Sequence, residues 1–406
     1  MVMAFTYCSW DCSVFTQSHE TENLKRGLSA SGLRKALSDV RIKMIKIPSK
    51  SKAAVLVEYG RPLEIRELSI PEVEPGGILV HNEMASVCGT DVHQWRGKGR
   101  PVPLPLVPGH EAVGKIVKLG QGRTKDCSGE PLNIGDRILW SHVSCGECYP
   151  CTITQQRTLC EDRFSYGYNY SLTGAFAEYE YVVPHTEVVK VPEELSNEEV
   201  VGACCAFRSV VGAFNRLAGI GIQSSVVIQG AGPVGLYATL LAHLSGAGQT
   251  IVIGAPALRL NLATRWGATH VIDIEKRPDA LNRKNEILEL TSGRGPDIVV
   301  EASGVPIAFG EGLDMIRRGG RYLVIGQTSP QTITMAPGTI VLKHLEIIGQ
   351  CGAEISHYYQ ALQIIKNNRQ KYPFGGIITH KYSLDQVNEA YASMEAGSNI
   401  KPAIVP

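Results

Sequence analysis

Residues 226–235 read Val-Val-Ile-Gln-Gly-Ala-Gly-Pro-Val-Gly, a β-branched run that ends in a Gly-x-Gly-x-x-Gly turn. Between a strand and a helix, this turn is typical of a dinucleotide-binding fold. The first glycine permits the tight turn, the second lets a pyrophosphate approach the backbone, and the third lets the helix pack closely on the strand. The N-terminus of the following helix offers N–H groups and a positive dipole to the phosphates. The cofactor-binding residues predicted here are Gly230, Gly232, Pro233, Val234 and Gly235.

Segments with strand and helix character alternate downstream of this turn. The expected strands are residues 250–254, 270–274, 297–302, 321–326 and 345–349, and the expected helices are 234–245, 257–266, 280–290 and 307–317. Repeated β-α units with right-handed crossovers form a parallel sheet with helices on both faces. The same pattern explains residues 226–248, an apolar stretch long enough to cross a bilayer, as a buried strand and helix.

The chain upstream of the turn has a different pattern. From about residue 53 to residue 192, short β-rich runs alternate with Gly and Pro, and the clearest runs are 53–57, 78–82, 113–117 and 135–138. Such spacing predicts a mostly β domain with a partly open barrel. Because 406 residues exceed the size at which a single core stops growing, two domains are expected.

Four of the eleven cysteines lie close together in this upstream part, at Cys145, Cys148, Cys151 and Cys160. Four thiolates on one loop form a closed tetrahedral zinc site with no position left for a substrate. An odd cysteine count in a long chain also favours metal binding in a reducing compartment over a disulfide framework. The spacing therefore predicts a structural zinc.

A second group of metal-binding side chains surrounds the stretch Cys88-Gly-Thr-Asp-Val-His93, which is followed by Gly109-His110-Glu111. Cys and His are ligands that Zn²⁺ prefers, and a catalytic zinc keeps three protein ligands and one open position. Alone, a buried Cys is usually an inert small hydrophobe. Its combination with the cysteine loop and the glycine turn indicates a candidate catalytic zinc site.

Together, these motifs resemble those of the zinc-dependent alcohol dehydrogenases of the medium-chain dehydrogenase/reductase superfamily, over roughly residues 52–406. The resemblance implies an α/β protein with a GroES-like, mostly β catalytic domain at 51–206 and 345–406. It also implies a doubly wound parallel-sheet (Rossmann) coenzyme domain at 207–344. The implied reaction is hydride transfer between an alcohol and NAD(P), with zinc as a Lewis acid on the substrate oxygen.

The resemblance places the catalytic zinc ligands at Cys88, His110 and Cys205, with Glu111 behind the metal. The choice of Cys205 over Cys204 comes from alignment through Val200 and Phe207. Adjacent side chains on a helix point about 100° apart, so the two cysteines cannot bind one zinc. Polyol dehydrogenases of the family tend to carry a carboxylate at this position, so a Cys favours an alcohol dehydrogenase-like site.

The resemblance also implies a proton relay in which Thr90 passes the proton of the substrate to His93, while Asp91 orients His110. Lys401 matches a basic position that contacts the pyrophosphate, and Ser209 and Ile325 are further coenzyme positions. Tyr166, Tyr168 and Tyr170 either face the substrate cleft or are surface aromatics of a loop.

The choice between NAD and NADP depends on the end of the second strand. NAD enzymes normally carry an acid about twenty residues past the turn, where it binds the ribose hydroxyls. Here the position is Gly254, and Arg259 follows, where it could pair with a 2′-phosphate. This pattern slightly favours NADP. Alternatively, Arg259 is a solvated helix residue and NAD binds through other contacts.

Two other functions are compatible with parts of the pattern: an NADPH-dependent reductase of an activated double bond, and a non-catalytic zinc- and nucleotide-binding relative. The intact Thr90 and His93 argue against the first, and the complete ligand trio argues against the second. With a net charge of +1, no nucleic-acid or membrane partner is expected, only a small alcohol or carbonyl substrate. A homodimer or homotetramer is expected, paired through residues 327–342.

Residues 1–50 do not match the family pattern. They are interpreted as a flexible extension, a targeting segment or translated sequence upstream of a later start at Met44. Transit peptides are poor in acids, so Glu20 and Glu22 weaken the targeting reading, and no secretory signal is visible. The expected location is cytoplasmic, or mitochondrial if this segment is a targeting sequence.

Overall fold

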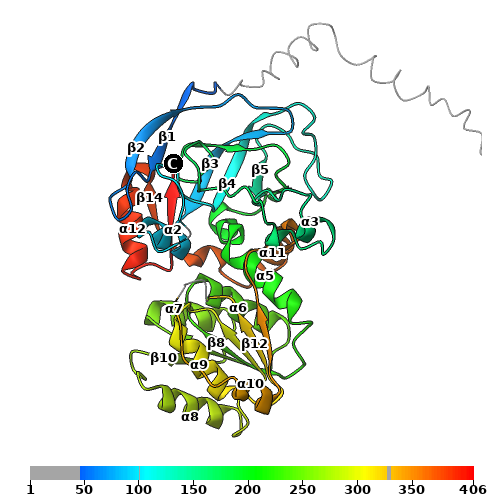
Figure 1. Ribbon diagram of the computed structural model, residues 1–406, viewed down its shortest axis with the longest axis vertical. Helices are drawn as coiled ribbons and strands as arrows, with labels where there is room; N and C mark the ends of the chain where they lie inside the picture. The colour runs from blue at the N-terminus through cyan, green and yellow to red at the C-terminus, as the bar shows by residue number, and fades with distance from the viewer. Residues whose placement is uncertain (1–45, 100, 327–330) are drawn as a thin grey trace, which may run out of the picture. The chain divides into compact units, whose positions relative to one another are not determined.

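A computed structural model describes residues 46–99, 101–326 and 331–406 (Figure 1). The predictions for residues 1–45 lie outside the described residues, as do those for 327–330 of the expected pairing segment.

The coenzyme domain is built on a parallel sheet of six strands in the order β10-β9-β8-β11-β12-β13. The strands are β8 (Ser225–Gln229), β9 (Gln249–Gly254), β10 (His270–Asp273), β11 (Ile298–Glu301), β12 (Arg321–Val324) and β13 (Glu346–Gly349). The strand order reverses between β8 and β11, and ligands of doubly wound sheets bind at such a switch point. The turn after β8 opens there, as the glycine pattern predicts.

Helices cover this sheet (Figure 1). They are α6 (Pro233–Leu244), α7 (Ala257–Arg265), α8 (Ala280–Leu290), α9 (Pro306–Met315) and α10 (Gly338–Lys343). The apolar stretch 226–248 is thus strand β8 and helix α6. Within the described ranges, no helix combines the length and apolarity needed to cross a bilayer. The short α10 was not predicted.

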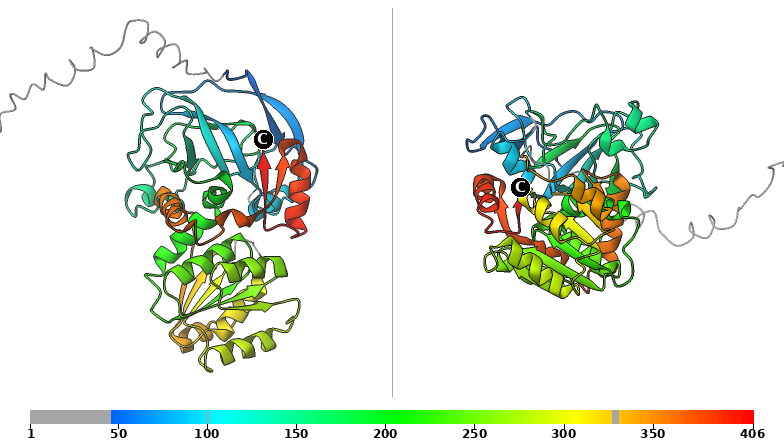
Figure 2. Two further views of the ribbon diagram at one scale, coloured as in Figure 1. Left: turned by 180° about the vertical axis from the view of Figure 1, so that it is seen from behind. Right: turned by 60° about the horizontal axis from the view of Figure 1, so that its bottom comes forward.

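The catalytic domain contains a seven-stranded sheet in which β14, β15, β3, β4, β5 and β7 are neighbours in that order and β6 pairs with β3. Its strands are β3 (Ile78–Ser86), β4 (Ala112–Leu119), β5 (Arg137–Trp140), β6 (Tyr179–Val182), β7 (Val188–Lys190), β14 (Ile378–Ser383) and β15 (Lys401–Val405). A separate hairpin joins β1 (Lys50–Val55) to β2 (Glu64–Ser69). The last strand, β15, lies between β14 and β3 (Figure 2), so the C-terminal segment completes the domain that the N-terminal part begins.

The helices of this domain are α2 (Gly89–Trp95), α3 (Tyr149–Thr152), α4 (Asn197–Val200), α11 (Ile355–Asn368) and α12 (Val387–Glu395). Helix α5 (Ala206–Arg216) contacts both α6 and α11, so it links this domain to the coenzyme domain. Short 3₁₀ segments include η1 (Arg157–Leu159), η2 (Val201–Cys204), η3 (Phe374–Ile377) and η4 (Leu384–Gln386).

One predicted domain boundary is wrong. Residues from 345 onward were assigned to the catalytic domain, but β13 pairs in parallel with β12, with Glu346 opposite Arg321 and Gly349 opposite Val324. The coenzyme domain therefore extends to Gly349. The boundary at 345 also conflicts with the strand 345–349 that the sequence predicts as part of the parallel sheet, and the observed pairing agrees with the strand.

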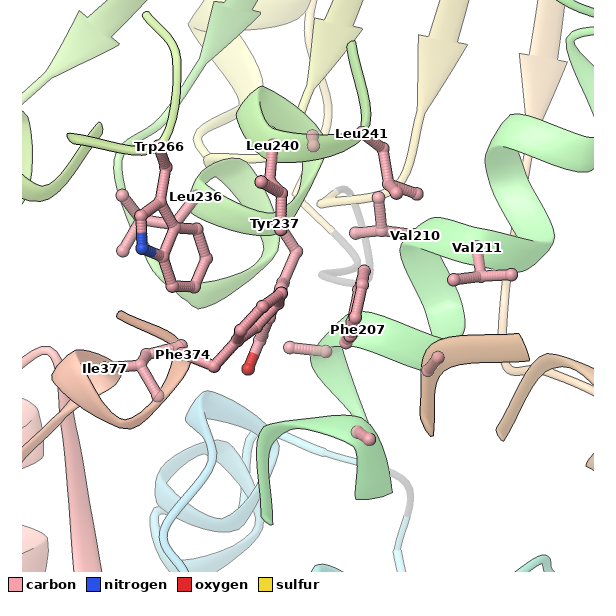
Figure 3. Packing of buried hydrophobic residues seen from close by; sticks show 14 of the residues in the cluster. Phe207, Val210, Val211, Leu236, Tyr237, Leu240, Leu241, Trp266, Phe374 and Ile377 are labelled. Carbon is pink, nitrogen blue, oxygen red and sulfur yellow. The ribbon is translucent and has the colours of Figure 1, made fainter. Parts of the chain in front are cut away.

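A cluster of buried aromatic residues joins α5 to the coenzyme domain (Figure 3). The rings of Phe207 and Tyr237 stack with centroids 4.3 Å apart, and Trp266 lies 5.1 Å from Tyr237. Phe374 of η3 contacts both Phe207 and Trp266. Aromatic pairs at these separations stabilise a fixed geometry. The packing thereby holds the start of α5, where Cys205 lies.

Candidate active site and metal centres

The first candidate metal centre brings together Cys88, His110, Glu111 and Cys205, whose ligand atoms all lie within 4.8 Å of one another. Cys88 precedes α2, the His110-Glu111 pair precedes β4, and Cys205 precedes α5. Three distant segments therefore meet through the packing of a strand and two helix N-termini. All four predicted residues lie in this one cluster.

The two adjacent cysteines have different environments. Cys205 is the residue at which the backbone leaves η2 and enters α5, with φ −143° and ψ −72°. The Sγ atom of Cys204 lies 3.2 Å from the carbonyl oxygen of Ala112 and is buried. The expected continuous helix through both residues is wrong, because the chain breaks at Cys205. This break directs the Cys205 thiol into the cluster and the Cys204 thiol into the core.

The charges of this cluster fit a divalent cation. Hydrogen bonding to Cys88 lowers the pKa of Cys205 to about 5, and the same contact raises the pKa of Cys88 to about 12. Two sulfur atoms so close share one proton, because two thiolates repel each other unless a cation lies between them. The Oε1 atom of Glu111 is buried 3.9 Å from His110 Nε2 and has no hydrogen-bond partner among the residues that the structure describes. Two thiols and an imidazole are the donor set that Zn²⁺ prefers.

Asp91 holds two of these groups in place. Its Oδ1 atom lies 3.1 Å from His110 Nδ1, and its Oδ2 accepts a hydrogen bond of 2.8 Å from the Cys88 backbone N–H. The carboxylate is 1% exposed. A carboxylate on one imidazole nitrogen leaves the other nitrogen unprotonated for a metal. This geometry fits the orienting role predicted for Asp91.

Lys401 does not have the predicted position. It was expected to contact the coenzyme pyrophosphate, but the residue is 1% exposed and its Nζ lies 2.5 Å from Glu111 Oε2. Ser86 donates a hydrogen bond to the same carboxylate oxygen. A carboxylate buried this deeply requires a cation beside it, and Lys401 on β15 is that cation.

The relay residues lie on α2 with a path to solvent. Thr90 Oγ1 is 3.7 Å from Cys88 Sγ, and both Thr90 and His93 are exposed. Because residues three apart share a helix face, a proton accepted at Thr90 can pass towards His93.

The second candidate metal centre consists of Cys145, Cys148, Cys151 and Cys160, whose sulfur atoms lie within 4.8 Å of one another. Backbone N–H groups point at these sulfurs: that of Cys145 donates to Cys160 Sγ at 3.2 Å, and that of Cys148 to Cys145 Sγ at 3.4 Å. The N–H groups of Glu147 and Cys148 lower the pKa of Cys145 to about 7. Burial has the opposite effect on two other thiols of the loop, since it raises the pKa of Cys151 to about 12 and also raises that of Cys160.

The glycine turn has the geometry of a phosphate cradle. Gly230 has φ +109°, a conformation that favours glycine. A Cβ on Gly235 would lie 1.8 Å from the Gly230 oxygen, whereas a Cβ on Gly232 would meet nothing within 4 Å. The open space thus lies at the second glycine, where the pyrophosphate was expected. Pro233 and Val234 then start α6.

The packing at the end of β9 explains why Gly254 stands where NAD enzymes normally carry an acidic residue. A Cβ on Gly254 would lie 2.6 Å from the Ala231 Cβ, so close packing excludes a longer side chain. Arg259 on α7 is half-buried, and its Nη2 donates to the Asn399 carbonyl at 2.9 Å while its Nε has no partner. Part of the Arg259 guanidinium therefore has no hydrogen-bond acceptor among the described residues.

The remaining predicted residues fall in different places. Ser209 Oγ donates to the Cys205 carbonyl at 2.8 Å, and Ile325 is buried at the end of β12. Tyr166 is a core residue bonded to Thr186, and Tyr170 is exposed. Tyr168 alone of the three is partly buried near the cluster, where His110 and Asp91 influence its pKa.

Two residues near the cluster were missed. Arg208 is buried and His142 is half-buried beside it, and neither belongs to a recognisable motif. A signal for Arg208 existed: it is the single charged residue in the apolar run 200–214.

Fold and site together define a zinc-binding dehydrogenase that uses a nicotinamide dinucleotide. Residues 74–193 match the family described as the alcohol dehydrogenase GroES-like domain, and residues 233–367 match the zinc-binding dehydrogenase family. The chain belongs to the zinc-dependent alcohol dehydrogenases of the medium-chain dehydrogenase/reductase superfamily. It is an oxidoreductase acting on alcohols, and the predicted fold and reaction class are confirmed.

Named relatives agree with this assignment. The 5-exo-hydroxycamphor dehydrogenase of Pseudomonas putida is 34% identical over 87% of this chain and 98% of its own length. An alcohol dehydrogenase structure from Thermotoga maritima has a TM-score of 0.83 at 34% identity, covering 88% of this chain and 99% of that one. A zinc-binding dehydrogenase from Sinorhizobium meliloti bound to NADP has a TM-score of 0.78 at 26% identity, covering 88% and 100%.

Proposed function

We propose that Cys88, His110 and Cys205 hold a catalytic zinc with Glu111 behind it, and that Cys145, Cys148, Cys151 and Cys160 hold a structural zinc. The observation that carries this proposal is the meeting of four donors within 4.8 Å, one of them a buried carboxylate oxygen without a partner. When bound, zinc supplies Lewis-acid polarisation of the substrate oxygen, and NAD(P) takes or gives the hydride.

The chain's own residues position the reactants and move the proton. Asp91 fixes the orientation of His110, and Lys401 neutralises Glu111. In the oxidative direction, Thr90 accepts the hydroxyl proton of the substrate and passes it towards His93, which reaches solvent. Gly232 and the N-terminus of α6 would hold the phosphates of the coenzyme.

The favoured coenzyme is NADP. The absence of a carboxylate at Gly254 removes repulsion against a 2′-phosphate, and Arg259 retains a buried nitrogen without a partner. The NADP-bound relative adds support. The favoured substrate is a small secondary alcohol, since the hydroxycamphor of the relative's name is one.

Assembly and location are also inferred. A second copy would cover the edge of β13 and the neighbouring side chains Val341 and Leu342, which are 71% and 74% exposed. All nine cysteines in the described part of the chain are free, which favours a reducing compartment such as the cytoplasm.

Two measurements on the purified protein test these proposals. Metal analysis of the wild type should give two zinc ions per chain, and a single ion would contradict the two-site assignment. Fluorescence titration with NADPH and NADH should show NADPH binding at least about tenfold tighter, equivalent to about 1.4 kcal/mol. Equal or tighter binding of NADH would contradict the role given to Gly254 and Arg259, and Arg259→Gln should then leave both affinities unaltered.

A further inference from the structure

Arg208 is a buried cation outside the predicted site. It lies in the first turn of α5 and is 4% exposed. Its Nε donates to the Cys204 carbonyl at 2.6 Å, and its guanidinium carbon lies 4.8 Å from the centre of the Tyr358 ring. Among the described residues, no carboxylate forms an ion pair with it, and its two terminal nitrogens donate no hydrogen bond. Burying an unpaired charge is costly, so such groups usually have a ligand or a counter-ion.

Arg208 lines a small cavity that is partly open to solvent. Its volume is about 20 Å³, and the walls include His142, Arg157, Arg163, Glu187, Glu354 and Arg208. One water molecule needs roughly 10–15 Å³ measured in this way. The space therefore accommodates the terminal group of a ligand and not a whole one.

The charge inside this cavity is positive. Glu187 is bonded to Arg157, and Glu354 Oε1 accepts the Thr158 N–H at 3.0 Å; neither of these two described carboxylates forms an ion pair with Arg208. Burial, together with the Arg208 charge, lowers the pKa of His142, which keeps this imidazole neutral. One negatively charged group bound in the cavity would balance this positive charge.

The cavity adjoins the candidate catalytic cluster. The ring of His142 lies 6.4 Å from that of His110, centroid to centroid. Arg208 follows Cys205 by three residues, and the nearby Cys205 and Glu111 of the cluster help to raise the pKa of its guanidinium. A molecule whose hydroxyl lies at the cluster can therefore extend a second group towards Arg208.

We propose that this cavity is a subsite for a carboxylate of the substrate, so that the enzyme acts on an alcohol that also carries a carboxylate. The chemistry fits because an arginine presents a planar fork of donors that matches a carboxylate. The inference rests on the proposed zinc and coenzyme function for the position of the hydroxyl, but the anion site itself does not depend on turnover.

Binding of a small carboxylate tests the site without catalysis. Propionate is titrated calorimetrically into the zinc-loaded wild type, Arg208→Gln and Arg216→Gln, the last a matched control on the same helix whose guanidinium is bonded to the Gly349 carbonyl outside the cavity. We expect Arg208→Gln to weaken binding at least about tenfold, with Arg216→Gln close to wild type. Propionate that fails to bind the wild type, or that binds Arg208→Gln equally well, would overturn the proposal, since the second result places it on the zinc.

Substrate preference tests the link to catalysis. The ratio of kcat/KM for 3-hydroxybutyrate to that for its neutral amide should favour the acid in the wild type. Arg208→Gln should lower this ratio about 10- to 100-fold, mainly through KM, and Arg208→Lys should recover part of it. Equal losses for both compounds would assign Arg208 a structural role and overturn the subsite. If neither compound is turned over while propionate binding depends on Arg208, the anion site stands and the assignment of a carboxylate-bearing alcohol as the substrate fails.

Discussion

The two cysteine-rich clusters differ in how the chain builds them. The cluster of Cys145, Cys148, Cys151 and Cys160 comes from one short loop, contains four identical donors and is ordered by local N–H groups. The cluster of Cys88, His110, Glu111 and Cys205 comes from three distant segments and has mixed donors. The loop cluster should therefore affect mainly local stability, and the mixed cluster should affect chemistry.

Replacing Cys205 should have the largest effect. Cys205→Ala should lower kcat about 10³-fold, equivalent to about 4 kcal/mol, because the Lewis acid loses a ligand. It should also remove one zinc per chain by mass spectrometry. The matched control is Cys204→Ala, which removes a thiol bonded to the Ala112 carbonyl. This variant should retain both zinc ions. Activity lost in Cys204→Ala and kept in Cys205→Ala would reverse the ligand assignment.

Breaking the ion pair between Lys401 and Glu111 should strongly reduce the stability of the fold. Lys401→Met leaves Glu111 buried without its cation, so the free energy of unfolding should fall by about 3–5 kcal/mol in urea denaturation. The double variant Lys401→Met with Glu111→Gln should recover much of this loss. A double variant as unstable as the single one would show that packing, and not charge, is responsible.

Disrupting the loop cluster should separate stability from chemistry. Cys148→Ser should release one zinc and lower Tm by about 5–10 °C, because the loop loses its metal cross-link. The folded fraction should retain kcat within about threefold, as judged by activity per bound coenzyme. A loss of kcat as large as in Cys205→Ala would mean that the two clusters are not independent.

Replacing Asp91, the carboxylate that orients His110, should have an intermediate effect on zinc binding. Asp91→Asn should weaken zinc binding at the mixed cluster about 10- to 100-fold in a competition with a chelator, as expected for a group that orients a ligand. The zinc of the loop cluster should resist the chelator as in the wild type. Equal release from both sites would contradict the assigned role.

The last prediction concerns the buried carboxyl of Glu180, which should change how stability depends on pH. Burial raises the pKa of Glu180 to about 8 from an ordinary value of 4.5. Because the folded pKa exceeds the unfolded one, the associated stability is complete below pH 4.5 and is lost as the pH rises to about 8. Glu180→Gln should flatten this slope in denaturation curves measured at several pH values. An identical slope in both proteins would exclude Glu180 as the source.

Patterns that depend on nearby residues were readable in the sequence. The glycine turn, the four-cysteine loop and the strand–helix alternation from β8 to β12 were predicted closely, because each reflects a local backbone or spacing requirement. Helices α11 and α12 were not predicted. Their apolar faces are completed only by elements far away in the sequence, such as α5 for α11 and β15 for α12.

The sequence by itself therefore determined the class of fold, the reaction class and the residues that could bind metal. The tertiary structure decided which of two adjacent cysteines enters the cluster, through the backbone break at Cys205. It also decided that Lys401 pairs with Glu111 and that Arg208 is buried without a carboxylate partner among the described residues. The physical reason is that the energy of a charge depends on burial and on its neighbours, and packing between distant segments sets both.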